Sequence, residues 1–223
     1  LEAMEGKFPP VSIAVEPTGQ GWRQVSLSRD GNTLAGVLYQ WTLDEEGGRQ
    51  YTYQGVLYDL EQGDQKLLVC PEERTLMGLD WSPVADRLVC ALAGEEGTSL
   101  RLWDAEGDAL EPFIEIPNPE GEIVVATDPA WSPDGRRVAF ALRHRHWWDD
   151  PKYRTDLMLV TADGEELTTL VESEWGNVAK HPSWSADGGQ IFYQFSRGEP
   201  AVPHGERKGG DIWSVTVLDP TPV

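Results

Sequence analysis

The sequence predicts an all-β protein built from four repeated units, and three observations carry that prediction. A serine recurs at intervals of roughly 50 residues, each copy preceded by an apolar residue and followed by an apolar run. Apolar and polar residues alternate with a period near two in most runs between turns. The 23 glycines and 16 prolines are spread along the chain and leave few long helix-forming stretches. The aligned serines are Ser28, Ser82, Ser132 and Ser185.

The fullest copy of the repeat, Trp131-Ser132-Pro133-Asp134-Gly135, predicts a hairpin tip between two strands. Proline presets φ for the first corner of the turn, aspartate hydrogen-bonds back to the backbone, and glycine takes the positive φ that closes the turn. The tryptophans before the second, third and fourth serines, Trp81, Trp131 and Trp184, are expected to pack between units. The second tip, Pro83-Val84-Ala85-Asp86, has no glycine, so it is expected to be built differently.

Each unit is expected to hold up to four strands. The first unit has predicted strands at 24–28, 33–41, 55–60 and 65–70. The second has them at 78–82, 87–92, 99–104 and, weakly because of Pro112, 110–114. The third has them at 130–132, 137–142, 156–161 and 166–171. The fourth has three, at 183–185, 190–195 and 211–216, and an unassigned strand, 11–16, precedes the first unit.

Four-stranded units repeated about every 50 residues are typical of the blades of a β-propeller. We expect a lead-in of residues 1–8 and one propeller domain over residues 9–223. Its blades are predicted near 22–71, 76–115, 128–172 and 181–217, with strand 11–16 completing the last blade. Three arrangements remain open: a closed four-bladed ring, an arc of a larger ring, and an arc completed by a second chain.

The segments WSPDGRRVAFAL, WSADGGQIFYQF and WSPVADRLVCAL resemble the repeats of TolB-type propellers. The third strands that open with Asp156-Leu157 and Asp211-Ile212 also match that family. The resemblance covers roughly residues 20–217 and implies a propeller fold and a place in the periplasm or at the cell surface. TolB-type rings usually have six or more blades, whereas four are visible here. Trp103-Asp104 resembles the close of a WD repeat, but the accompanying Gly-His pair is absent.

Composition excludes several classes of function. The formal charge of −20 argues against a nucleic-acid partner, whose phosphates the average field would repel. No apolar run reaches the roughly 18 residues that a membrane helix needs, so no membrane insertion is expected. Residues 1–10 lack the pattern of a signal peptide. Cys70 and Cys90 are expected to be buried thiols, although one bridge between them is left open.

Catalytic and cofactor motifs are absent from the sequence: there is no GxSxG, HExxH or GxxxxGK pattern and no cysteine cluster. We therefore expect a chain that is not an enzyme and holds no cofactor. A metal hypothesis would use His144, His146 and Asp149, with His181 or His204 completing the set. It is weak because residues of a His-x-His pair point to opposite faces of a strand, so no metal is expected.

Binding residues are predicted in the connections between second and third strands, which are long in every unit except the second. Loops held by a rigid scaffold commonly carry binding residues. In the first unit this connection holds Trp41, Tyr51 and Tyr53. The predicted partner-binding residues are Arg143, His144, Arg145, His146, Trp147, Trp148 and Arg154 in the third unit and Arg197, His204 and Arg207 in the fourth. In the competing interpretation, Trp147 and Trp148 fold over the blade edge and the arginines neutralise nearby carboxylates.

The sequence therefore favours a non-catalytic binding module, a sensor or scaffold whose loop face, rich in Arg, His and Trp, meets a protein partner with an acidic segment. Arginine pairs with carboxylates and aromatic side chains anchor interfaces, which supports that partner. One alternative is the gating propeller of a serine peptidase resembling prolyl oligopeptidases, and another is a receptor for a glycan or small ligand. The chain is expected to be a monomer, or a dimer that completes a ring.

Overall fold

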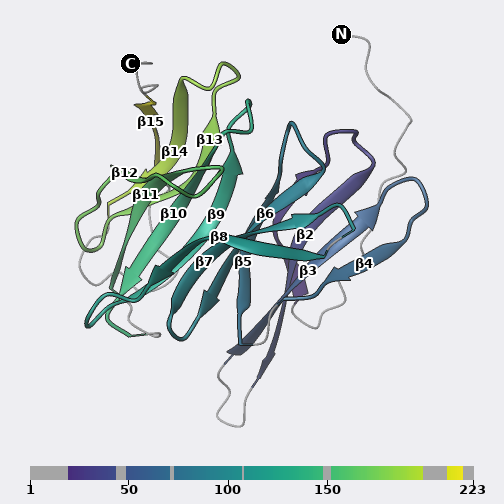
Figure 1. The fold of residues 1–223 in the computed structure, drawn as a ribbon. Helices are drawn as coiled ribbons and strands as arrows, with labels where there is room; N and C mark the ends of the chain where they lie inside the picture. The colour runs from purple at the N-terminus through teal and green to yellow at the C-terminus, as the bar shows by residue number, and fades with distance from the viewer. Residues whose placement is uncertain are drawn as a thin grey trace.

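The computed structural model describes residues 20–43, 49–70, 73–106, 108–147, 152–197 and 210–217. These residues form strands and turns arranged as four blades that stand side by side like those of a fan (Figure 1). The first two blades are separate sheets, whereas a parallel bridge between Thr155 and Val178 joins the third and fourth into one seven-stranded sheet. None of the described residues forms a helix, so this part of the chain has no helix long and apolar enough to span a bilayer. The all-β prediction is confirmed.

Each blade is an antiparallel meander whose strands pair in chain order. The first holds β1 (Gln20–Leu27), β2 (Thr33–Leu43), β3 (Arg49–Asp59) and β4 (Gln65–Leu68). The second holds β5 (Thr75–Trp81), β6 (Arg87–Gly94), β7 (Gly97–Asp104) and β8 (Ala109–Pro117). The third holds β9 (Ile123–Trp131), β10 (Arg137–Arg145), β11 (Tyr153–Thr161) and β12 (Leu167–Val171). The fourth holds β13 (Val178–Trp184), β14 (Gln190–Ser196) and β15 (Asp211–Thr216).

The predicted strands that fall on the described residues are all present, but several are longer than the sequence suggested. β3 begins at Arg49 rather than at residue 55, and β10 continues to Arg145. β8 passes through Pro112, where the pairing with β7 shifts register. The predicted strand 11–16, and with it the completion of the fourth blade, lies outside the described residues.

The first strand of each blade lies innermost and contacts the first strand of the next blade, so β1, β5, β9 and β13 stand next to one another. Each of these strands has a register shift at the same point of the repeat, four or five residues before the motif serine. A bulge of this kind bends a strand and redirects its side chains. At two of these bulges, Asp128 and His181 take positive φ values of 53° each.

The core consists of three layers of side chains, each between two neighbouring blades. Trp81 and Trp131 are buried in the first two layers, and Trp184 packs against the third. The guanidinium carbon of Arg87 lies 5.3 Å from the ring centre of Trp131 in the next blade, and Arg137 lies 5.5 Å from Trp184. The prediction that these tryptophans pack between blades is confirmed.

The hairpin tips have the chemistry that their sequence predicts. The Ser132 hydroxyl donates to the Asp134 carboxylate at 2.6 Å, and Gly135 donates its N–H to the Ser132 carbonyl at 2.9 Å with φ of +67°. In the second tip, which lacks glycine, the Val84 N–H points to the Ser82 hydroxyl at 3.4 Å instead. Cys70 and Cys90 are both free thiols, which settles the question of a bridge between them.

Candidate binding site

The structure moves the predicted binding residues of the third unit from a loop onto strands. Arg143, His144 and Arg145 belong to β10 and Arg154 to β11, so the prediction that they lie in a connection is wrong. The antiparallel ladder continues to the pair Arg145 and Tyr153, which satisfies backbone groups that a loop would leave to water. In the first unit, likewise, Trp41, Tyr51 and Tyr53 lie on β2 and β3.

Three of the predicted residues, Trp148, His204 and Arg207, lie outside the described residues. Arg197 directly follows β14. His146 and Trp147 lie in the short connection after β10 and are exposed. Among the predicted residues that the structure describes, those of the third unit lie together.

Because side chains alternate along a strand, the basic residues at the end of β10 divide between the two faces of the third sheet. His144 lies directly opposite Arg154 on one face. Arg143 and Arg145 lie on the other face, where Arg145 is opposite Tyr153. The two groups have different surroundings and different chemistry.

On the first face, His144 lies between two carboxylates. Its Nδ1 is 2.9 Å from Glu122 Oε2, and its Nε2 is 3.1 Å from Asp156 Oδ2 but not aligned for a hydrogen bond. Arg154 donates to Asp156 at 3.0 Å, and the Ser173 N–H donates to the other oxygen of that carboxylate at 2.8 Å. This group is internally paired and largely buried, so it fits the competing interpretation, in which the basic residues neutralise carboxylates.

On the second face, the guanidinium carbons of Arg143 and Arg145 lie 5.0 Å and 5.6 Å from the ring centre of Tyr153. The Nε of Arg143 is buried without a hydrogen-bond partner. Burial lowers the pKa of Arg143, and the positive charges of Arg145 and of Arg23, from β1, lower it further. The negative charge of Asp128 opposes these effects, so Arg143 is a cation whose buried Nε lacks an acceptor.

An exposed aromatic cluster extends from the end of the same hairpin. The His146 ring stacks on Trp175 at 4.3 Å between ring centres, and Trp147 lies 6.2 Å from His146. Trp147 is 56% exposed and Trp175 is 42% exposed. We call His146, Trp147 and Trp175 the aromatic platform. Arg154 lies over Trp175, 5.9 Å from its ring centre, and joins the platform to the paired face.

Trp175 belongs to the connection between β12 and β13. The connection after β10 and this blade-joining connection therefore lie side by side. Trp175 itself was not among the predicted site residues. A signal for it existed, because it is a tryptophan in a polar connection rather than one of the tryptophans before a motif serine.

The histidines proposed for a metal site do not converge. His144 is buried between carboxylates, His146 stacks on Trp175, and His181 Nδ1 is 3.4 Å from Asp128 Oδ2. Over the described ranges, no group of three or more His, Cys, Asp or Glu side chains could hold a metal ion. Asp149 and His204 lie outside those ranges.

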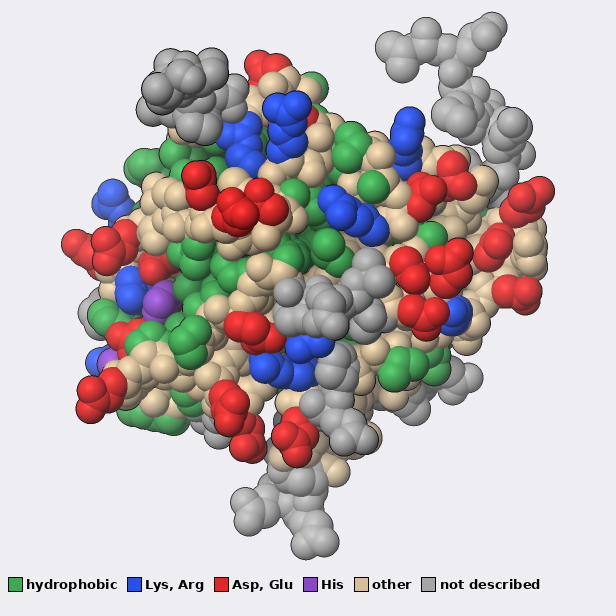
Figure 2. All heavy atoms as spheres, in the orientation of Figure 1, with side chains coloured by type: hydrophobic (Ala, Val, Ile, Leu, Met, Phe, Trp, Pro, Cys, Tyr) green, Lys and Arg blue, Asp and Glu red, His purple; other side chains and the backbone are tan. Residues whose placement is uncertain are grey.

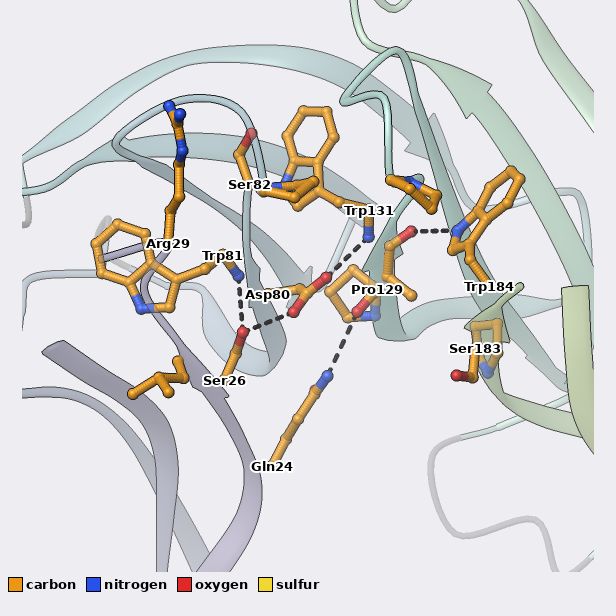
Figure 3. Close-up of a pocket in the computed structure, with 15 residues that line it drawn as sticks. Gln24, Ser26, Arg29, Asp80, Trp81, Ser82, Pro129, Trp131, Ser183 and Trp184 are labelled. Carbon is orange, nitrogen blue, oxygen red and sulfur yellow. Dashed lines mark hydrogen bonds between the residues drawn. The ribbon is translucent and has the colours of Figure 1, made fainter. Parts of the chain in front are cut away.

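At the opposite end of the blades, the hairpin tips surround a hollow of about 650 Å³ (Figure 3). Three of its polar side chains, Gln24, Ser26 and Asp80, are already paired across blades. Asp80 accepts hydrogen bonds from Ser26 and from the Trp131 N–H, and Gln24 reaches from the first blade to the Pro129 carbonyl of the third. Burial raises the pKa of Asp80. These contacts are joints between blades, so this hollow is a weaker candidate than the far end of the third blade.

Comparison with solved structures places the fold. The chain superposes on TolB from Acinetobacter baumannii with a TM-score of 0.53 and 13% identity, over 88% of this chain and 44% of that one. A putative dipeptidyl aminopeptidase IV from Bacteroides ovatus superposes with a TM-score of 0.53 and 12% identity, over 81% of this chain and 32% of that one. Oligogalacturonate lyase from Vibrio parahaemolyticus superposes with a TM-score of 0.50 and 17% identity, over 86% of this chain and 50% of that one. The fold is that of a β-propeller.

Comparison of sequences finds similarity over a shorter part of the chain. No family model matches the chain. A stretch of 74 residues is 38% identical to an uncharacterized peptidase, YuxL, of Bacillus subtilis (strain 168). That stretch is 33% of this chain and 10% of the relative, and the chain spans at most half of each of the three solved structures.

Proposed function

We propose that this propeller is a non-catalytic binding module of the TolB type, in a sensor or scaffold role. It would present the far end of its third blade to an acidic segment of a protein partner. The observation that carries the proposal is the aromatic platform, in which two largely exposed tryptophans flank a histidine beside strand arginines. Exposed tryptophans that gather at one place, next to arginines, are typical of interface anchors.

Charge supports the same end of the molecule. The protein carries a formal charge of −20, and Asp and Glu side chains are scattered over the side seen in Figure 2. An acidic partner would be repelled by most of this surface. The arginines at the end of β10 would instead attract an acidic partner. Arg143 has no ion pair within the described part of the chain.

The test is a peptide selection that needs no known partner. A displayed random-peptide library is selected on the wild-type protein and on Trp147→Ala/Trp175→Ala. Trp213→Ala serves as the matched control, because Trp213 is 44% exposed but lies on β15 of another blade. We expect peptides rich in Asp, Glu and aromatic residues that bind wild type and the control alike and bind the double variant at least about tenfold more weakly.

Equal binding of the selected peptides to wild type and to the double variant would overturn the proposal. A glycan array on the wild-type protein tests the alternative of a glycan receptor. Glycan binding that disappears in the double variant, with no peptide enrichment, would replace the protein partner by a glycan.

A second candidate is the propeller part of a serine peptidase. It is favoured by the 74-residue match to the uncharacterized Bacillus subtilis peptidase and by the fold likeness to a putative dipeptidyl aminopeptidase IV. The reading frame on both sides of these 223 residues decides the matter. A contiguous hydrolase segment with a Gly-x-Ser-x-Gly motif would favour the peptidase, because a propeller there restricts substrate access rather than recruiting a partner.

A further inference from the structure

The face of the first blade that points away from the second blade is apolar, and we call it the open face. Residues directly opposite each other in an antiparallel sheet share one side of it. The aliphatic residues that the pairing places on this side are Val25, Leu27, Leu34, Leu38, Val56 and Leu67. None of them belongs to a core layer of the described chain, and Val25, Leu27 and Leu67 are 53%, 51% and 47% exposed. No paired position on this side is charged, although a quarter of the sequence is.

The open face repeats the face that the second blade presents to the first. Leu27 directly precedes its motif serine, as Trp81 does in the second blade, and pairs with Leu34 on the next strand. Trp81 is buried in the core layer against the first blade, whereas Leu27 has no blade over it among the described residues. Val25 likewise stands at the place of Leu79, which is fully buried in that layer. The open face therefore has the form of a surface that receives another blade.

The fourth blade, at the other end of the arc, carries a face of the complementary kind (Figure 1). Phe192 and Ile212 lie on its outward side, because the alternate residue Ile191 is buried in the third core layer. They are 40% and 73% exposed. They stand at the places of Ala139 and Leu157, which the third blade packs against the fourth. The other paired residues on this side of β14 and β15 are Gln, Ser and Thr, so these two strands place no charge on it.

The hydrogen-bonding positions at the two ends also match. Between the second and third blades, the Asp80 carboxylate accepts from the Trp131 N–H, and Ser26 has the same role one blade earlier. Ser183 holds this acceptor position in the fourth blade, and no donor of this kind meets its hydroxyl among the described residues. Leu27 holds the donor position in the first blade. Both Ser183 and Leu27 line the hollow of Figure 3, so an acceptor and a donor position remain for one more joint.

We propose that a second copy of this chain packs the outward side of its fourth blade on the open face, and that the reciprocal contact closes a ring of two copies. Such a ring would hold eight blades, at the upper end of the range of about four to eight that is usual for propellers. Closed two-fold assemblies are the commonest oligomers. The two faces let chains with a formal charge of −20 meet without opposing like charges on these strands. The inference does not depend on the proposed function.

The experiment measures the mass of the 223-residue chain by light scattering and native mass spectrometry, over protein concentrations of about 1–100 μM. We expect wild type to have the mass of two chains. Val25→Lys on the open face and Ile212→Asp on the fourth blade should each raise the dissociation constant at least about tenfold, because each buries an unpaired charge in an apolar contact. Leu167→Asp is the matched control and should remain a dimer, since Leu167 is 42% exposed on the outermost strand of the third blade.

Mixing the two interface variants gives a result that misfolding cannot imitate. Neither variant alone can form a junction that is wild type on both sides. A mixed ring has one such junction, and its second junction sets Val25→Lys against Ile212→Asp, which carry opposite charges. We therefore expect the mixture to regain the mass of two chains. Should Val25→Lys not fold, Leu67→Lys replaces it on the same face.

Three outcomes would overturn the inference. A wild-type monomer at every concentration would assign the open face to other residues of its own chain. A dimer that both interface variants leave unchanged would place the contact elsewhere on the molecule. Assemblies that lengthen with concentration would exclude the closed ring, because head-to-tail contacts that do not close produce filaments. The aromatic platform lies on the third blade, so each of these outcomes leaves the proposed function standing.

Discussion

The carboxylate of Asp80 accepts a hydrogen bond of 2.8 Å from the backbone N–H of Trp131, and this bond ties the second blade to the third. The preceding joint has the same plan, because the Ser26 hydroxyl accepts from the Trp81 N–H at 3.0 Å. Ser26 also donates to Asp80 at 2.7 Å, so the two joints are continuous. At the third joint Ala130 occupies this position, and the Trp184 indole donates to its carbonyl at 3.0 Å.

Replacing Asp80 by alanine should lower the free energy of unfolding by about 2–3 kcal/mol, because it leaves the Trp131 N–H without an acceptor in a buried place. Asp80→Asn should cost less than about 1 kcal/mol, since its oxygen can still accept from Trp131 and its amide can donate to Ser26. Urea unfolding of both variants at pH 7 measures the difference. Equal losses would mean that the joint depends on charge and not on the acceptor.

The tip aspartates should make stability fall in acid. Burial would raise the pKa of Asp134, but hydrogen bonds from the Ser132 hydroxyl and the Arg136 N–H, together with nearby arginines, bring it below its usual range. A carboxyl with a lower pKa in the folded state stabilises the fold above about pH 4, and this contribution is lost as the pH falls through the folded pKa. Wild-type Tm should therefore decline between pH 5 and pH 3.

Ser132→Ala tests the origin of that decline, because it removes the strongest hydrogen bond to Asp134. Its Tm should lie below that of wild type at pH 7, and the gap should narrow toward pH 3, where the carboxyl is protonated in both proteins. A gap that stays constant across this range would assign the loss to packing of the buried Ser132 and to the hydrogen bond that its hydroxyl accepts from the Arg137 N–H at 2.9 Å, rather than to the bond with Asp134.

Trp131→Ala should cost about 3–5 kcal/mol, as a large-to-small change in a packed core. Trp131 is 5% exposed and fills the layer between the second and third blades. Trp147→Ala, at an exposed position, should stay within about 0.5 kcal/mol of wild type. Denaturant midpoints of the two variants provide the comparison, and similar midpoints would contradict the packing described here.

Gly164→Ala should destabilise more than Gly31→Ala, although both glycines have positive φ, +77° and +76°. A methyl group at Gly31 meets no atom within 4 Å, so the cost there is only the backbone strain of about 1–2 kcal/mol. At Gly164 the added carbon would collide with the carbonyl oxygen of Phe113 in the second blade. Thermal unfolding of the pair isolates the interblade collision from the strain that both share.

The repeat made the blades, the tips and the packed tryptophans predictable, because each depends on residues close together in the sequence. The location of Arg143 and its neighbours could not be predicted, since a run of basic and aromatic residues can extend a hairpin as readily as it can form a loop. Only the pairing with β11 decides between them. Trp175 escaped prediction because its partner, His146, belongs to a different connection. Binding by Arg197, His204, Arg207 and Trp148 remains a prediction.

The hydrogen bonds that join neighbouring blades bear on how a repeat protein of this kind can gain blades in evolution. Their donor is most often a backbone N–H, which every residue except proline supplies, so only the acceptor demands a particular side chain. A tandem copy of one repeat of about 50 residues supplies both the donor and the acceptor for the hydrogen bond to a neighbouring blade. Gene duplication can therefore lengthen the arc without inventing an interface, and Ala130 shows that a lost acceptor side chain can be offset by a tryptophan indole from the next copy.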